Sequence, residues 1–259
     1  RHIATHTPGA PDGTGLHPFL FTSLPGSFPL LAQWLDTILH SRTTPAHRRL
    51  LATKTLNAKV KPDKATGSLP STASAATAAR PLARHPVTRR LVAGRLASLL
   101  SPRSRPHYVS LHQYGLVPSG LDAAPRRHQL HHDLRHRSLA SASLDIKNAH
   151  TTVSRRATYC PIADRATHTQ HPHDALFALY FLSYYHAPTT TLIQVGQAYH
   201  AYLQTDGLDQ GEALASHAFG LCLAPLISLH LLPKCPGLTA SLIHDDTLFE
   251  APTLTTAVP

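Results

Sequence analysis

Hydrophobic residues near the start of the chain recur at helical spacing. Between residues 29 and 41 they fall three and four positions apart, so they form one apolar stripe. Pro29 at the beginning of this stretch, and His40 and Arg42 at its end, suit the polarity of a helix. The pattern therefore predicts an amphipathic helix over residues 29–41.

A second amphipathic stretch covers residues 87–99. Its apolar side carries Val87, Leu91, Val92, Leu96 and Leu99. Arg89, Arg90 and Arg95 lie largely off that side, so each of these arginines is expected on a solvated helix face. Residues 67–79, between the two stretches, are low in complexity and indicate a flexible loop.

The second half of the chain predicts both helices and strands. Residues 174–186 are apolar and rich in aromatic residues, which indicates a buried helix, and residues 189–205 have the pattern of extended strands. A long apolar helix is expected from residue 212 to residue 232, with a kink or a break at Pro225 because proline lacks the amide hydrogen. Residues 238–250 then predict a hairpin with an aspartate pair at or near its turn.

The composition is that of a globular chain. Its 259 residues, 42% of them hydrophobic, are enough for a substantial core in one or two domains. The longest apolar run, residues 219–232, is shorter than the roughly 20 residues that span a membrane. The first residues show no signal-peptide pattern. Neither a membrane partner nor secretion is therefore expected.

Sulfur-containing residues indicate the compartment and the extent of the chain. Cys160, Cys222 and Cys235 are odd in number and lack metal-type spacing, which fits a reducing, intracellular setting in the nucleus or cytoplasm. Methionine is absent, also at position 1. We therefore expect a fragment of a longer reading frame.

Charge divides the chain into two unequal halves. Residues 1–137 carry 19 Lys and Arg against 5 Asp and Glu, whereas residues 138–259 carry 5 against 9. A basic region is the electrostatic footprint of nucleic-acid binding, although soluble basic proteins without such a partner also exist. The asymmetry favours one part that contacts phosphates and another part that holds cations.

Histidine is frequent, with 21 residues, and two tracts of it suggest metal binding. Residues 122–137 are expected to be helical, and spacings of three and four there place imidazoles on one face. These are His128, His131, His132 and His136. No cysteine accompanies them or the tract at residues 168–173, as the usual structural zinc patterns would require. A histidine-rich zinc protein therefore stays a third alternative.

Two acidic clusters lie at the edges of apolar, strand-like runs. Asp145 follows one run, and the adjacent pair Asp245 and Asp246 follows another. Without further context, Asp145 caps a strand and the pair forms an ordinary turn. Carboxylates brought together are also the ligands that Mg²⁺ prefers, and two such ions about 3.5–4 Å apart serve polymerases and nucleases.

Between the acidic clusters lies a short glycine-containing segment. Gly211 allows close approach of the backbone to a ligand, and Gln210 offers both a donor and an acceptor. Taken alone, this dipeptide is a turn. It is one of several motifs that follow each other in a fixed order: Lys61-Pro-Asp-Lys64, Arg80-Pro-Leu-Ala, His112-Gln-Tyr-Gly, Leu144-Asp-Ile-Lys-Asn-Ala, Gln210-Gly-Glu-Ala-Leu and His244-Asp-Asp-Thr-Leu.

This succession, from about residue 50 to residue 252, resembles the reverse transcriptase domain of non-LTR (LINE-like) retrotransposons. The resemblance implies an α+β fold of the right-hand polymerase type, with an antiparallel palm sheet packed on helices. Residues 1–137 would form a basic fingers region with an N-terminal helical segment. Residues 138–259 would form the palm, and the chain would end before the thumb.

The resemblance also implies the reaction and its participants. A primer 3′-hydroxyl, on DNA or RNA, would attack the α-phosphate of a deoxynucleoside triphosphate on an RNA template. Asp145, Asp245 and Asp246 would be catalytic and would bind two Mg²⁺ ions, with Mn²⁺ able to substitute. The nucleotide and template would contact Lys61, Lys64, Arg80, His150, Gln210 and Gly211.

Several positions depart from the family pattern. His150 stands where the family usually has Phe or Tyr, whose ring blocks a ribose 2′-hydroxyl. Ala213 replaces a proline, and Ile243 replaces an aromatic residue before the aspartate pair. The alternative to an RNA-directed DNA polymerase is therefore a decayed, catalytically inactive remnant that only binds nucleic acid.

Overall fold

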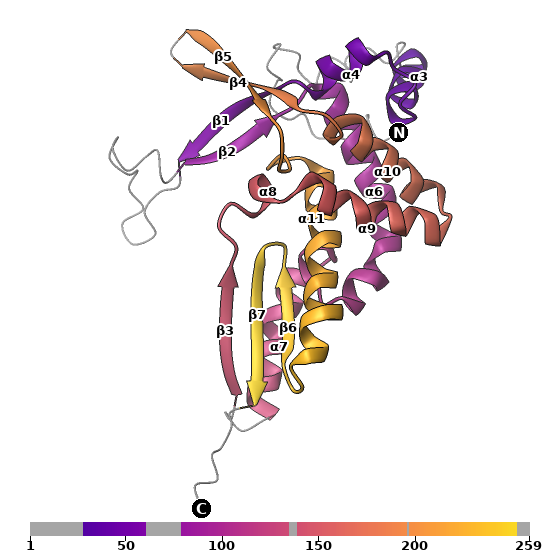
Figure 1. Cartoon of the computed structure of the whole chain (residues 1–259). Coiled ribbons are helices and arrows are strands. Elements are labelled where there is room, and N and C mark those ends of the chain that lie inside the picture. Colours follow the sequence, from indigo (N-terminus) through magenta and orange to yellow (C-terminus); the bar gives the residue numbers. More distant parts are fainter. Residues whose placement is uncertain (1–27, 61–78, 135–138, 196, 253–259) are drawn as a thin grey trace, which may run out of the picture.

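The computed structural model describes residues 28–60, 79–134, 139–195 and 197–252 (Figure 1). Helices open the described chain, and their bounds are α3 (Phe28–Leu39), α4 (Pro45–Ala52) and α6 (Val87–Ser110). The amphipathic helix predicted over residues 29–41 is thus confirmed as α3. Helix α4 begins in the expected way, because the side chain of Thr44 accepts a hydrogen bond from the amide of His47 and a proline follows it.

A four-stranded sheet combines strands from both halves of the chain. Its strands are β1 (Lys54–Val60), β2 (Ala79–Arg84), β4 (Thr189–Val195) and β5 (Ala198–Gln204), in the order β2-β1-β4-β5. Strand β1 pairs antiparallel with β2 and parallel with β4, whereas β4 and β5 form an antiparallel hairpin. The extended strands predicted over residues 189–205 are confirmed. Strands from both sides of residue 137, the expected boundary between fingers and palm, therefore pair in one sheet.

A second sheet is three-stranded and entirely antiparallel. Its strands are β3 (Leu139–Asp145), β6 (Thr239–Ile243) and β7 (Asp246–Pro252), in the order β3-β7-β6. The hairpin predicted over residues 238–250 is confirmed, and His244 and Asp245 form its turn. The short helix α8 (Ala149–Thr152) lies between the two sheets (Figure 1).

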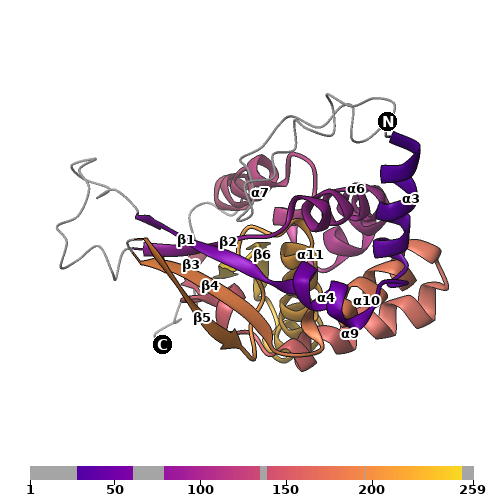
Figure 2. The same ribbon diagram turned by 90° about the horizontal axis from the view of Figure 1, so that it is seen from above.

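The main core lies among helices rather than between the sheets. The remaining long helices are α7 (Gly120–Leu134), α9 (Arg155–Thr169), α10 (Pro172–Tyr185) and α11 (Ala213–Pro225), and a short 3-10 helix, η2, covers Tyr114–Leu116. Leu96 of α6, Phe177 and Phe181 of α10, and Leu214 of α11 are buried in one cluster. Viewed from above, the four-stranded sheet extends to one side of this helical body (Figure 2). The buried helix predicted over residues 174–186 is confirmed as α10.

The apolar segment after residue 212 changes its helical form at Pro225, as expected for a proline inside a helix. Helix α11 gives way to a π-helical stretch, η3 (Leu226–Leu231), and then to a 3-10 turn, η4 (Leu232–Lys234). Within the described ranges, the run Ala213–Lys234 is long and apolar enough to cross a membrane, and half of its most apolar window is buried inside the protein. Burial of α11 in the core accounts for much of this apolar character.

The face of α6 that carries Arg89 is not solvated, so that prediction was wrong for this arginine. Arg89 is fully buried, whereas Arg95 on the same helix is exposed. Helix α6 packs against α3, α10 and α11, which together cover more of its circumference than its apolar stripe indicates. Arg89 tolerates burial because carboxylate and tyrosine side chains from distant parts of the chain surround it.

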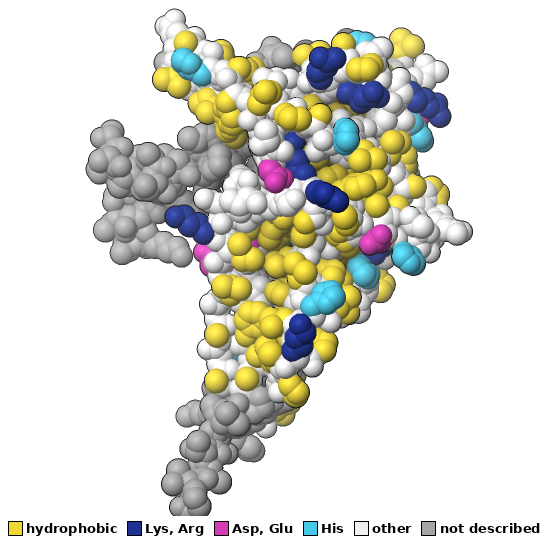
Figure 3. Space-filling model, in the orientation of Figure 1, with side chains coloured by type: hydrophobic (Ala, Val, Ile, Leu, Met, Phe, Trp, Pro, Cys, Tyr) yellow, Lys and Arg dark blue, Asp and Glu magenta, His cyan; other side chains and the backbone are white. Residues whose placement is uncertain are grey.

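The β4–β5 hairpin projects from the helical body and presents apolar side chains to solvent (Figure 1; Figure 3). Its exposed large hydrophobic residues are Ile193, Val195, Tyr199, Tyr202 and Leu203. No Lys, Arg, Asp or Glu occurs in β4 or β5, and β5 is the edge strand of its sheet.

Candidate active site

The acidic residues predicted to bind metal meet at one end of the three-stranded sheet. Asp145 is the last residue of β3, and Asp246, the first residue of β7, lies directly opposite it. Asp245 precedes Asp246 in the hairpin turn. Directly opposed residues of an antiparallel pair share one face, with Cα atoms about 4.5–5.5 Å apart. The fold thus brings Asp145 together with carboxylates that lie 100 and 101 positions further along the sequence.

Within the described ranges, no cationic side chain balances the three carboxylates. Asp145 and Asp246 are exposed and Asp245 is half-buried. Among the described residues, none forms an ion pair or a side-chain hydrogen bond with any of the three. Like charges directly opposite each other destabilise a strand pair. Unpaired oxygen donors in this position fit a hard divalent cation such as Mg²⁺.

Gln113 holds the turn that carries Asp245. Its side-chain oxygen accepts hydrogen bonds from the amides of His244 (3.0 Å) and Gly115 (3.1 Å), and its side-chain nitrogen donates to the carbonyl of His244 (3.3 Å). Gln113 is completely buried. A further hydrogen bond joins the amide of Leu242 to the carbonyl of His112 (2.8 Å). The segment before η2 therefore fixes the position of the aspartate turn.

Two residues at this contact have backbone requirements. His244 adopts a positive φ of 56° in the turn. A Cβ atom added to Gly115 would lie 2.6 Å from the amide nitrogen of His244, which is closer than any side chain can approach. The turn and the segment beside it thus fit only with glycine at position 115. The family resemblance includes the motif at residues 112–115, but it does not assign Gln113 to the support of the aspartates.

His150 lies beside the acidic cluster. It belongs to α8, and its ring stacks on Phe219 of α11 with ring centroids 4.9 Å apart and planes tilted by 24°. Burial lowers the pKa of His150, and the negative charge of Asp245 acts in the opposite direction. The carbonyl of His150 accepts a hydrogen bond from the amide of Leu208 (2.6 Å). His150 therefore connects the aspartates to the loop that contains Gln210 and Gly211.

Gln210 and Gly211 lie against β2. The carbonyl of Gln210 accepts a hydrogen bond from the amide of Ala83 (3.0 Å), and Gly211 has a positive φ of 100° that favours glycine. Arg80 lies on the same strand, opposite Lys59 of β1. Lys61 and Lys64 lie outside the described residues, so their predicted contact with phosphates is not placed. The glutamine–glycine segment and the arginine-bearing strand are neighbours.

Residues that sequence reasoning missed surround this loop. Asp209 and Glu212 flank Gln210 and Gly211, and both are buried with cationic partners from β1 and α6. The one signal in the sequence was a pair of acidic residues next to a predicted contact segment. Nothing in the sequence indicated that Lys54, His85 and Arg89 are their partners.

The histidine tract in α7 lies away from the aspartates along the sheet. His128 contacts Glu250, near the far end of β7, and the side chains of His131 and His132 and residue His136 lie outside the described part. In the other tract, the ring of His171 meets that of His173 with centroids 4.8 Å apart. Among the described residues, neither tract gathers three ligand groups around one point.

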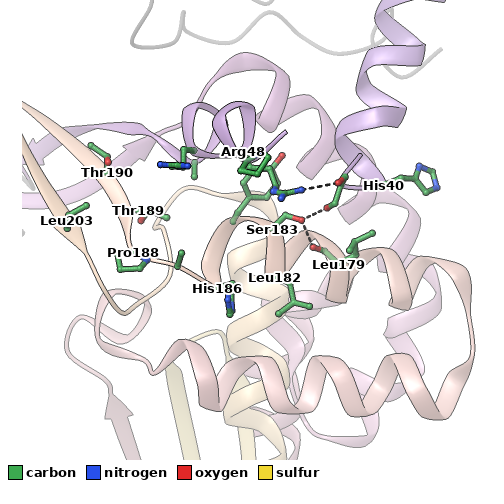
Figure 4. A pocket seen from close by; sticks show the side chains of 16 residues that line it. His40, Arg48, Leu179, Leu182, Ser183, His186, Pro188, Thr189, Thr190 and Leu203 are labelled. Carbon is green, nitrogen blue, oxygen red and sulfur yellow. Dashed lines mark hydrogen bonds between the residues drawn. The ribbon is translucent and has the colours of Figure 1, made fainter. Parts of the chain in front are cut away.

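A cavity of about 760 Å³ lies between α4, α10 and β4 (Figure 4). Arg48 and Ser183 point into this region, but Arg48 already donates to the carbonyls of Ser41 (3.2 Å) and Thr43 (2.9 Å). None of the predicted site residues lines the cavity. It is therefore separate from the acidic cluster.

Comparisons with known proteins give a structural likeness only. The sequence matches no protein-family model and no curated protein. Among solved structures, the fold is similar to that of apo telomerase from Candida tropicalis, truncated from its C-terminal domain. The TM-score is 0.47 and the sequence identity 11%, over 79% of this chain and 44% of the telomerase chain. The chain thus spans less than half the length of that protein.

Proposed function

We propose that this chain is the fingers and palm part of an RNA-directed DNA polymerase of the non-LTR retrotransposon type. In this proposal the three-stranded sheet is the palm, and the antiparallel pair of β1 and β2 with the basic first half of the chain belongs to the fingers. The observation that carries the proposal is the pairing of Asp145 with Asp246 beside the turn that holds Asp245. The order of the sequence motifs supports it.

The proposed reaction is nucleotidyl transfer. The 3′-oxygen of a DNA or RNA primer forms a bond to the α-phosphorus of a deoxynucleoside triphosphate, the bond between the α-phosphorus and the bridging oxygen breaks, and pyrophosphate leaves. The hydroxyl proton passes to solvent. An RNA template selects the nucleotide by base pairing. Chemistry of this kind depends mainly on positioning and on stabilisation of charge.

The residues have distinct proposed tasks. Asp145, Asp245 and Asp246 would hold two Mg²⁺ ions. When bound, these ions would lower the pKa of the attacking hydroxyl and stabilise the leaving oxygen. Mn²⁺ is expected to substitute. Gln113 keeps the turn of Asp245 in place. The nucleotide and template would lie against His150, Gln210, Gly211 and Arg80, with Lys61 and Lys64 near the triphosphate.

We also propose an intracellular location, in the nucleus or cytoplasm, where RNA and deoxynucleotides are present. Support comes from the cysteines: Cys160, Cys222 and Cys235 are all free, and Cys160 is exposed. Exposed free thiols persist in a reducing compartment.

Primer extension tests the proposal. The chain is incubated with a primed RNA template, the four deoxynucleotides and Mg²⁺, next to Asp145→Asn and Asp245→Asn. Extension by the native chain alone is the expected result. Asp164→Asn, an exposed aspartate on α9, is the matched control and should leave extension intact. If the native chain extends no primer with either Mg²⁺ or Mn²⁺, the polymerase assignment is wrong.

The second candidate is a catalytically inactive remnant that binds nucleic acid. The stacking of His150 on Phe219 favours it. Position 150 carries a histidine ring packed on α11, where the family usually has the Phe or Tyr that blocks a ribose 2′-hydroxyl. This candidate predicts salt-dependent binding to primed RNA without extension. Its binding should survive Asp145→Asn.

A further inference from the structure

The loop formed by residues 206–212 is held at its first residues by Arg155. The amide of Arg155 donates to the side chain of Asp206 (2.6 Å), and its guanidinium donates to the carbonyl of Gly207 (2.9 Å). Gly207 has a φ of 78°, and a Cβ atom there would lie 2.2 Å from the carbonyl oxygen of Thr151. Leu208, the next residue, is completely buried. The first three residues of the loop, 206–208, are therefore fixed in position.

Asp209 is the first of two buried carboxylates in this loop. Its side chain forms an ion pair with Lys54 of β1, accepts a hydrogen bond from His85 (2.8 Å), and lies 3.5 Å from the guanidinium of Arg89. The side chains of Lys54, His85, Arg89 and Asp209 are each at most 2% exposed. Burial raises the pKa of Asp209, but the hydrogen bond from His85 and the charge of Lys54 outweigh it, so the pKa lies well below its usual range.

Glu212 is the second buried carboxylate. The guanidinium of Arg89 donates to both of its oxygens (3.1 and 3.0 Å), and the hydroxyls of Tyr180 and Tyr185 donate to it as well. The same guanidinium lies 4.5 Å from the ring centroid of Tyr184. Such forked arginine–carboxylate contacts are directional, so they fix orientation as well as distance.

The buried cluster of Lys54, His85, Arg89, Asp209 and Glu212 does not fit a metal site, although three of its residues have the spacing of metal ligands. The ligand atoms of His85, Asp209 and Glu212 lie within 4.8 Å of one another. Lys54 and Arg89 already supply one positive charge to each carboxylate. A divalent cation would have to displace both of these buried side chains. The negative charge that would attract a metal is therefore balanced by the protein.

We propose that this buried cluster is a positioning device for Gln210 and Gly211. The carboxylates stand directly before and directly after these two residues, and their cations come from β1 and from α6, which lie on either side of β2 in the sequence. The hydrogen bond from Ala83 of β2 to Gln210 lies between these two anchors. Because the anchors come from β1 and α6, the elements directly before and directly after β2 in the sequence, the loop and the strand that carries Arg80 are held in one relative position.

The inference rests on the proposed function, because it assumes that Gln210 and Gly211 contact a nucleotide or template. Ion pairs are a poor way to gain stability in a core: exchange of a buried pair for apolar residues is often neutral or stabilising. Their directional contacts instead serve placement. A displacement of about 1 Å at a polymerase-type site reduces the rate by about 100-fold.

The test replaces the pair Lys54 and Asp209 by apolar residues of similar size, in the double variant Lys54→Met with Asp209→Leu. The matched control is Arg165→Met with Asp174→Leu, a largely buried pair between α9 and α10, remote from the loop in sequence. Three quantities are measured for each protein: the midpoint of thermal unfolding, hydrogen exchange of the amides of residues 206–212, and the KM and kcat for deoxynucleotide in primer extension.

The positioning role predicts a separation between these readouts. The Lys54/Asp209 double variant should keep its thermal midpoint, exchange the loop amides at least about 10-fold faster, and show a KM raised by about 10- to 100-fold. The control pair should change neither exchange nor KM. The single variant Lys54→Arg, which keeps the positive charge beside Asp209, should have a KM close to that of the native chain.

The outcomes distinguish the two proposals. If the double variant is folded and has native loop exchange and native KM, the positioning role is wrong. If the native chain extends no primer, the polymerase proposal fails, and the exchange measurement still decides whether the cluster holds the loop. Should the double variant fail to fold, Lys54→Met with Asp209→Asn, which removes both charges and keeps the shape of the side chain at position 209, takes its place under the same criteria.

Discussion

Asp145 lies directly opposite Asp246 across β3 and β7, so two negative charges occupy one face of the sheet, and among the described residues no cationic side chain pairs with either. The arrangement makes the end of the sheet a cation site and, at the same time, a weak point of the structure in the absence of a cation.

Asp246→Asn is therefore expected to raise the free energy of unfolding in metal-free buffer, by about 0.2–1 kcal/mol, because it removes the like-charge contact. After addition of Mg²⁺, the native chain should have the larger free energy of unfolding of the two proteins. The native chain should gain about 2.7 kcal/mol at 100 times the dissociation constant, and the variant should gain less. Urea unfolding with and without Mg²⁺ measures both effects. Equal Mg²⁺ responses of the two proteins would contradict the cation site.

Gln113→Leu should destabilise the protein through the aspartate turn. It leaves the amides of His244 and Gly115 without their acceptor at a partly buried position, and loss of a buried acceptor costs about 1–3 kcal/mol, so about 1 kcal/mol is expected for each. The midpoint of urea unfolding should fall accordingly. Gln129→Leu is the control, since this glutamine is exposed on α7, where its side chain donates a hydrogen bond to Asp133 (2.8 Å). A similar loss in both variants would argue against a special role of Gln113.

Arg89→Met should be among the most damaging substitutions in the chain. It leaves Glu212 ionised in a buried site, and removal of one partner of such a pair costs about 3–5 kcal/mol. The double variant Arg89→Met with Glu212→Leu should regain most of this stability. Arg95→Met, at an exposed position of the same helix, should change the free energy of unfolding by less than about 0.5 kcal/mol. Failure of the double variant to recover would mean that packing, not charge, is the cause.

His217 should make stability fall in mild acid. Burial, and to a smaller degree His244 and Arg165, lower its pKa to about 4 from the ordinary value of 6.5. The unfolded chain takes up this proton near pH 6.5 and the folded chain only near pH 4. The contribution of the neutral ring is thus complete above pH 6.5 and is lost as the pH falls to 4, by about 3 kcal/mol in total.

Unfolding measured from pH 7 to pH 4 checks this expectation. His217→Asn should have a shallower dependence on pH than the native chain, although it also loses the hydrogen bond between His217 and Tyr108 (3.1 Å). Ser98→Ala, at an exposed position without a titratable side chain, should keep the native slope. Identical slopes for all three proteins would show that His217 is not the group responsible.

Local patterns in the sequence were sufficient to predict the elements whose conformation depends on residues close in sequence. Apolar spacing predicted α3 and α10, and the turn after residue 243 predicted the β6–β7 hairpin. The ordered motifs also placed Asp145 near Asp245 and Asp246. In each of these cases the determining contacts are close in sequence, or the resemblance to a family supplied the long-range pairing.

The interactions that the sequence did not predict join residues that lie far apart along the chain. Arg89 was expected in solvent because its helix carries only one apolar stripe, and its partner Glu212 lies 123 positions away. Gln113 acts on His244, 131 positions further on. A side chain's burial depends on what covers it, and a single sequence contains no record of these pairings. The roles of Lys61, Lys64 and Arg80 stay predictions.

The parallel pairing of β1 with β4 has a practical meaning for anyone who wants to divide this protein. Lys54, Thr55 and Leu56 pair with residues 191–193, and the cations of the first half neutralise the buried carboxylates of the second. A piece ending at residue 137 would expose a strand edge and uncompensated positive charges, and the other piece would expose the complementary surface. Each half is thus the folding partner of the other, and soluble protein from two separate pieces requires their synthesis in the same cell.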